Sequence, residues 1–125
     1  MSVSNAINQH ETPIAASTSD TNLPASNTAA VITYAAGSAG VQHCLSGVAW
    51  SYSAAPTNGN LKIEDGSGNT IFSVDITAAG PGFIPFNPPK KGTAATALII
   101  TLAAGGTGIS GKINACGHWT EGPNP

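Results

Sequence analysis

The clearest pattern in the chain is a two-residue alternation of apolar and polar positions between residues 47 and 82. Residues 48–53 and 70–77 each place apolar side chains on one face and small or polar side chains on the other. The apolar positions are Val48, Trp50, Tyr52, Phe72, Val74 and Ile76. Such alternation predicts strands that are buried on one face.

Turn residues separate these strands. Asn58-Gly59 is the dipeptide most typical of a short hairpin turn, and residues 65–69 (DGSGN) are a second turn between two alternating runs. Residues 61–65 and 70–77 are therefore expected to form a hairpin. Further strands are expected over residues 30–34, 41–46 with a continuation to 53 past a possible bulge at Gly47, 94–103 and 109–120.

Residues 78–93 contain several prolines, which cannot donate to a central ladder of hydrogen bonds. This segment is expected to be an edge strand or a long surface loop. The segment 94–103 is expected to be the most buried strand. In the last strand, Ile113, Ala115 and Trp119 are expected to share one face.

These seven to eight short strands predict an all-β fold, an antiparallel two-sheet sandwich that could be of the jelly-roll type. The composition agrees, because 15 Gly and 9 Pro in 125 residues favour turns over helices. The sandwich domain is expected over residues 29–125.

Residues 1–28 are expected to form an extended N-terminal arm, since they show neither a strand nor a helix period. Ordering them costs on the order of 30–50 kcal/mol of backbone entropy. Their few apolar side chains would each contribute roughly 2 kcal/mol if buried. These side chains are Val3, Ile7, Ile14 and Leu23. A neighbouring subunit or larger partner is expected to hold the arm, the alternative being the sheet edges of its own domain.

Charge is scarce: the chain has four lysines, no arginine and six acidic residues, for a net charge of −2. Nucleic-acid binding requires basic side chains that neutralise phosphates, so we expect none. We expect no membrane segment and no secretory signal, which implies synthesis in a cytosol. A surface so poor in charge suits a protein that packs against neighbours.

The candidate metal ligands are the two cysteines and their neighbouring histidines, in His43-Cys44 and Cys116-Gly117-His118. In extended strands Cys116 and His118 point the same way while His43 and Cys44 point oppositely, so at most three ligands would converge. No metal is expected. The cysteines are expected to be free thiols, with a disulfide between them or a metal site as alternatives.

No catalytic chemistry is expected either. No nucleophile sits in a recognisable elbow, and Glu64 and Asp65 lie on opposite faces of a strand. The turn at residues 65–69 lacks the distal acid of a calcium loop, and no cofactor is expected. Trp50, Tyr52 and Trp119 could form a sugar-stacking surface, although aromatic residues in a sandwich more often belong to the core.

Four segments between residues 47 and 112 resemble small virion proteins of tailed bacteriophages, in particular capsid decoration (cement) proteins. They are GVAWSYS, LKIEDGSGNTIFSVDIT, AAGPGF and ALIITLAAGG followed by GK. The resemblance covers roughly residues 40–120. It implies a β-sandwich that forms a homotrimer on the capsid exterior and clamps neighbouring major capsid protein subunits.

The function expected from these features is that of a structural virion protein, made in the host cytoplasm, which stabilises a phage capsid. The contacts are expected to come from the four apolar residues of the arm and from Phe83, Ile84 and Phe86 in the proline-rich segment. The alternative is a receptor- or carbohydrate-binding module of a phage tail fibre or tip.

Overall fold

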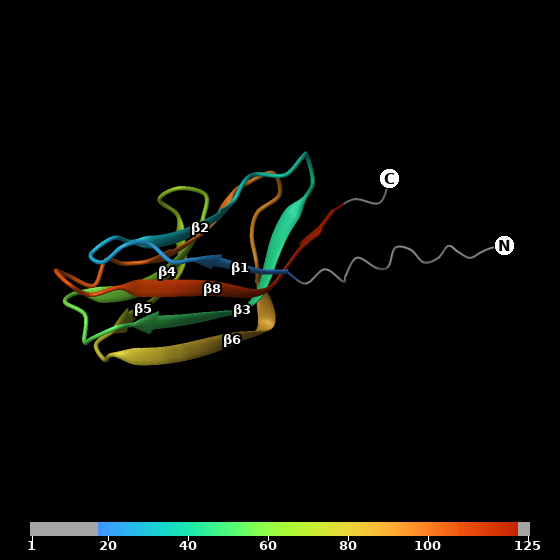
Figure 1. Cartoon of the computed structure of the whole chain (residues 1–125). Helices are drawn as coiled ribbons and strands as arrows, with labels where there is room; N and C mark the ends of the chain where they lie inside the picture. The colour runs from blue at the N-terminus through green and yellow to red at the C-terminus, as the bar shows by residue number, and fades with distance from the viewer. Residues whose placement is uncertain (1–17, 123–125) are drawn as a thin grey trace.

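A computed structural model of the chain describes residues 18–122, which form two antiparallel four-stranded sheets (Figure 1). Sheet A contains, in spatial order, β1 (Thr18–Asn22), β8 (Gly111–Glu121), β3 (Gln42–Tyr52) and β6 (Gly80–Lys91). Sheet B contains β2 (Ala30–Tyr34), β7 (Leu98–Leu102), β4 (Gly59–Asp65) and β5 (Thr70–Ile76). The all-β sandwich is therefore confirmed. In this part of the chain no helix is long and apolar enough to cross a membrane.

The strand order is that of a jelly roll. Strand β1 pairs with β8, β2 with β7, β3 with β6 and β4 with β5. This nested pairing is the result of rolling up one long hairpin whose tip is the β4–β5 turn. The chain consequently passes from one sheet to the other at every connection except β4–β5. Two sheets closed in this way bury their inner faces against each other.

The core lies between the sheets and is built from the inward positions of the alternating strands. In β7, the expected most buried strand, Leu98, Ile100 and Leu102 are fully buried. Leu61 and Ile63 of β4 meet them from the neighbouring strand, and Val48 and Ile113 meet them from sheet A. Strand β2, which pairs with β7 in sheet B, is confirmed at the expected residues 30–34.

The two expected turns have different outcomes. The hairpin of β4 and β5 is confirmed, with residues 65–69 as its turn. The interpretation of Asn58-Gly59 as a hairpin turn is wrong, because the connection that contains it crosses from β3 in sheet A to β4 in sheet B. Asn58 still adopts the positive φ of 58° that favours Asn at turns.

Part of the segment expected to be an arm belongs to the sandwich. Residues Thr18–Asn22 form β1 and pair with β8, and the Asn22 side-chain oxygen accepts a hydrogen bond from the Val31 backbone N–H at 3.1 Å. The backbone N–H and C=O groups of β1 are hydrogen-bonded to β8 at the edge of the same domain. This pairing does not require apolar residues in β1. The apolar residues Val3, Ile7 and Ile14 lie outside the described residues.

Strands β3 and β8 bend together near one end of sheet A, where the ends of both strands turn upward in Figure 1. In a regular strand every second residue points inward, but in β3 the inward residues Leu45 and Val48 are three positions apart. In β8 the inward residues Ala115 and His118 are likewise three positions apart. Both strands thus switch faces within the same paired stretch. At this point β6 carries residues 86–89 opposite a single residue of β3, so an irregularity is found near Gly47 as expected, with the extra residues in β6.

Gly117 allows β8 to make this bend. Its φ is +71°, and a Cβ atom added to it would collide with the Ser46 hydroxyl oxygen. That hydroxyl lies 3.1 Å from the Cys116 carbonyl oxygen and 2.9 Å from that of Gly117, to which it donates. The face switch therefore depends on a glycine on one strand and a small hydroxyl residue on the other.

We expect Gly117→Ala to destabilise the protein more than Gly68→Ala. Both glycines have positive φ, which costs about 1–2 kcal/mol for alanine. Only the Gly117 substitution adds a steric collision, for which we expect a further loss of roughly 1–3 kcal/mol. Urea unfolding of both variants measures the difference. Adding Ser46→Ala to Gly117→Ala should recover part of the loss, and equal destabilisation by the two single substitutions would contradict this account of the bend.

Candidate functional site

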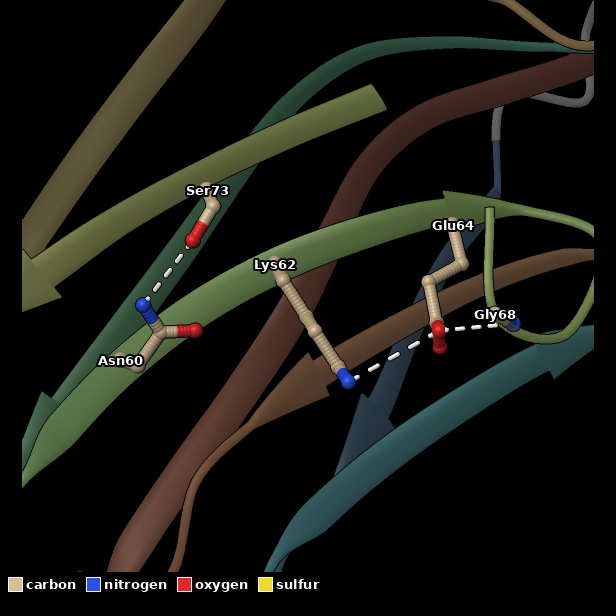
Figure 2. A network of polar contacts seen from close by, with 5 residues as sticks. All are labelled: Asn60, Lys62, Glu64, Gly68 and Ser73. Atoms are coloured by element: carbon tan, nitrogen blue, oxygen red, sulfur yellow. Dashed lines mark hydrogen bonds and ion pairs between the residues drawn. The ribbon is translucent and has the colours of Figure 1, made fainter. Parts of the chain in front are cut away.

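The outer face of sheet B is polar, and its side chains bind one another (Figure 2). The Asn60 amide donates to the Ser73 hydroxyl at 3.0 Å. The Glu64 carboxylate lies 3.7 Å from the Lys62 ammonium and accepts a hydrogen bond from the Gly68 backbone N–H at 2.9 Å. Because these groups already have partners on their own sheet, this face offers few of them to a ligand.

The outer face of sheet A is different, because an aromatic side chain lies exposed on it. Phe83 of β6 is 57% exposed, and its register partner is Ala49 of β3, which is in turn paired with Asn114 of β8. Residues directly opposite each other on antiparallel strands carry side chains on the same face. A row of an aromatic ring, a methyl group and an amide therefore runs across three strands.

The neighbouring rows add small and polar groups to this face. Gly47 and Ser51 are the outward positions of β3 on either side of Ala49, and Lys112 of β8 pairs with Ser51. We refer to this surface as the Phe83 platform, and it consists of Gly47, Ala49, Ser51, Phe83, Lys112 and Asn114. Lys112 provides its one formal charge, so the platform is nearly neutral.

The sequence of β3 leaves room for the Phe83 ring. A Cβ atom on Gly47 would lie 3.0 Å from the Cε1 and Cζ atoms of Phe83, so the ring covers a position that only glycine leaves open. On β6, Pro81 and Pro85 occupy the outward positions on either side of Phe83. Prolines have no N–H to offer to another strand, which protects the free edge of β6 from pairing.

The expected edge strand 78–93 is confirmed as β6, but it does not present all three of its expected contact residues. Phe86 is only 8% exposed and packs edge-on against Phe72, with ring centroids 5.1 Å apart. Ile84 is half-buried against the core. Phe83 alone is available on the surface. The reason is the two-residue period, which sends Ile84 and Phe86 inward when Phe83 points outward.

Leu23 from the expected set is 61% exposed and follows β1 directly. Val31, on the adjoining strand β2, is 39% exposed. The two are brought near each other by the hydrogen bond between Asn22 and the Val31 backbone. Two exposed apolar side chains thus lie on adjoining segments at the edge of the sandwich, separate from the Phe83 platform, and we refer to them as the Leu23 area. In the sequence, nothing beyond its place in a predicted strand marks Val31 as an exposed apolar residue.

The aromatic residues considered for sugar stacking do not gather on one surface. Tyr52 is 2% exposed and donates a hydrogen bond to the Ala103 carbonyl oxygen, while Trp50 packs against the core over Gly82. The expectation that Trp119 shares the inner face with Ile113 is wrong, because the bend at Gly117 turns Trp119 outward. There its indole N–H donates to the Glu121 carboxylate at 3.1 Å.

The cysteines and histidines lie on opposite faces of sheet A. His43 and His118 point inward, whereas Cys44 and Cys116 point outward. The expectation that Cys116 and His118 point the same way is wrong for the same reason, the positive φ of Gly117 between them. Within residues 18–122 no group of three or more His, Cys, Asp or Glu side chains could hold a metal ion. Cys44 and Cys116 are free thiols.

The turn at residues 65–69 uses its acidic group structurally. The Asp65 carboxylate accepts hydrogen bonds from the Thr93 backbone N–H at 2.8 Å and from the Thr93 hydroxyl at 2.5 Å. This links the β4–β5 turn to the segment that follows β6. The turn whose sequence resembles part of a calcium loop thus joins two loops through the Asp65 carboxylate.

The sequence matches no protein-family model and no curated protein. Among solved structures, the chain is similar to a carbohydrate-binding module, CBM36, in complex with calcium and xylotriose. The identity is 15%, the match covers 79% of this chain and 77% of that chain, and the TM-score is 0.37. It is also similar to the CBM36-1 domain of a multidomain xylanase from the hindgut metagenome of Trinervitermes trinervoides. Here the identity is 12%, the coverage 81% and 76%, and the TM-score 0.38. These values are too low to assign a ligand to this chain.

We expect the two thiols to differ in reactivity towards iodoacetamide. Cys44 is 1% exposed, and burial, followed by the nearby Glu121 carboxylate, raises the pKa of its thiol, which Lys91 only partly opposes. Cys116 is half-buried and should react first, by at least about tenfold. Mass spectrometry after timed labelling at pH 8 measures both rates. A Cys116→Ser variant should label only when denatured, and equal rates for the two thiols would contradict the arrangement.

Proposed function

We propose that this protein is a non-catalytic binding module and that the Phe83 platform binds a neutral glycan. The observation that carries the proposal is the ring of Phe83, 57% exposed and lying over Gly47 on a sheet face. A sugar ring has an apolar face of C–H groups and a rim of hydroxyl groups. An exposed aromatic ring beside small residues suits the apolar face.

The polar side chains of the platform suit the rim of the sugar. The Asn114 amide has donors and an acceptor, and the Ser51 hydroxyl has both, so each can bond a sugar hydroxyl whichever role it takes. Asn114 lies in the same row across the sheet as Phe83, and Ser51 lies in the adjacent row. An apolar surface with a few polar groups that fix orientation is the usual composition of a small-molecule site.

The charge of the platform favours a neutral ligand over an anionic one. Lys112 is its one charged side chain, and the chain as a whole carries a net charge of −2. Binding of a polyanion depends on several Lys or Arg side chains that displace counterions. Cleavage of the glycan would need two acidic groups flanking the bond, and the six residues of the platform include no acid.

We expect Phe83→Ala to weaken glycan binding by at least about tenfold, because stacking on one aromatic ring is lost. Affinity electrophoresis in gels that contain neutral polysaccharides, followed by calorimetry with the best ligand, measures the change. Phe83→Trp should retain binding. Lys62→Ala, on the outer face of sheet B, is the matched control and should bind as the unaltered protein does. Failure to bind any neutral glycan, or unchanged binding by Phe83→Ala, would refute the proposal.

A second candidate function is the capsid-stabilising role implied by the resemblance to decoration proteins. The observation that favours it is the apolar area of Leu23 and Val31, since uncharged apolar area at a sandwich edge suits contact with another protein. We propose that this area joins copies of the chain into a homotrimer that binds a capsid shell. The two functions use different surfaces and are compatible.

We expect Leu23→Asp combined with Val31→Asp to convert a trimer into a monomer, because the contact would then bury unpaired charges. Sedimentation velocity over a range of protein concentrations measures the mass. Phe83→Ala should remain trimeric, which separates this area from the Phe83 platform. A monomeric unaltered protein, or a double variant that stays trimeric, would rule out this assembly.

A further inference from the structure

Four polar side chains from four strands meet inside the bent corner of the sandwich. Tyr34 of β2 donates its hydroxyl hydrogen to the Asp20 carboxylate of β1 at 2.5 Å. The Tyr34 ring stacks on the His118 imidazole of β8, with centroids 3.6 Å apart and planes 3° from parallel. His118 Nε2 lies 2.9 Å from Nδ1 of His43 on β3. His43 is 6% exposed, whereas His118 and Tyr34 are half-buried, so the contact lies at the margin of the core.

The hydrogen-bond partners determine where the protons of the pair lie. His43 Nε2 is 2.7 Å from the Ala35 carbonyl oxygen, which can only accept, so this nitrogen carries a hydrogen. In a neutral ring Nδ1 of His43 then has a lone pair and must accept a hydrogen bond. The donor is the Nε2–H of His118. A single N–H therefore joins the two imidazoles.

A first proton added to His118 leaves the hydrogen bond between the rings in place, whereas a second proton has no comparable arrangement in this corner. If both rings were charged, two N–H groups would face each other across 2.9 Å, and two like charges would lie side by side at a part-buried contact. Among residues 18–122, the one carboxylate that faces the cluster is that of Asp20, and it already accepts the Tyr34 hydroxyl hydrogen. Of the remaining titratable groups in the described part of the chain, Cys116 of β8 interacts electrostatically with Tyr34, although its side chain points to the other face of the sheet. Cys44, Lys91 and Glu121 lie on the other face of sheet A.

We propose that this corner is a pH-dependent latch, in which the neutral imidazole pair holds β1 and the bent ends of β3 and β8 together and proton uptake opens them. Opening would free the edge of β8 to which β1 is paired. The latch is independent of the glycan-binding and capsid-binding proposals, since it uses neither the Phe83 platform nor the Leu23 area. It is a property of the fold that either function could use.

The electrostatic surroundings of His118 agree in sign with the latch. Burial, followed by the neighbouring His43, lowers the pKa of His118, and Asp20 only partly opposes this. A base whose pKa is lower in the folded state contributes stability that is fully present above its unfolded pKa of about 6.5. That contribution is lost as the pH falls from there through the folded pKa. Acid therefore weakens the corner, and neutral pH restores it.

Hydrogen exchange of the full chain at pH 7.5 and pH 5.0, read by mass spectrometry, tests the latch. The amides of the β4–β5 hairpin serve as the internal reference, because the chemical rate of exchange itself changes with pH. We expect residues 18–22, 43–46 and 116–120 to lose at least about tenfold more protection than the hairpin at pH 5.0. An equal change in both regions would overturn the proposal.

Two variants keep the test decisive. His118→Phe retains a ring against Tyr34 but cannot take up a proton, so its corner should respond to pH as the hairpin does. Should this variant fail to fold at pH 7.5, judged by circular dichroism, NMR titration of a His10→Ala variant replaces it. His43 and His118 are then the remaining histidines of the three in the chain. We expect His118 to titrate with a pKa below the ordinary value of about 6.5. Titration of His118 with a pKa at or above about 6.5 would refute the latch.

Discussion

The structure depends on one constraint, the simultaneous change of face in two paired strands. At Ser46–Gly47 in β3 and Cys116–Gly117 in β8, both strands turn over while their pairing register is kept. The Ser46 hydroxyl donates to the Gly117 carbonyl oxygen at 2.9 Å and lies 3.1 Å from the Cys116 carbonyl oxygen, so a backbone acceptor at the bend has a donor from the neighbouring strand. Without the change of face, sheet A would continue flat, and its end would leave the interior open.

The bend decides what each face of sheet A can do. Inward, it brings two histidines into contact with Tyr34 and closes the end of the core with groups that titrate. Outward, it turns Trp119 to the exterior, places both cysteines on the outer face of sheet A with Cys44 still buried, and leaves Gly47 beneath the Phe83 ring. The proton-binding corner and the Phe83 platform are thus the two faces of neighbouring segments of the same strands. The outer polar groups of sheet B bind each other, and the sheet mainly covers one side of the core (Figure 2).

The local pattern was sufficient to predict those elements whose stability is local. The β4–β5 hairpin has its turn, its alternation and its partner strand within one short segment, and it was predicted correctly. The edge position of β6 followed from its prolines. By contrast, β1 has no apolar alternation at all, and it exists because β8 offers a free edge. Residues 18–22 by themselves predict an arm, because pairing at a sheet edge leaves no signature in side chains.

The sequence by itself determined the class of the fold, the inner face of most strands and the near absence of charge, because each follows from residue type and a period of two. The tertiary structure decided which strands are neighbours, and therefore which side chains form a site. Phe83 was recognisable as an apolar residue, but its partners Ala49 and Asn114 come from strands distant in sequence. Likewise, the contact between His43 and His118 spans 75 residues and requires a bend that reverses the alternation. Alternation predicts a face only while the strand stays regular, and the candidate sites lie where it does not.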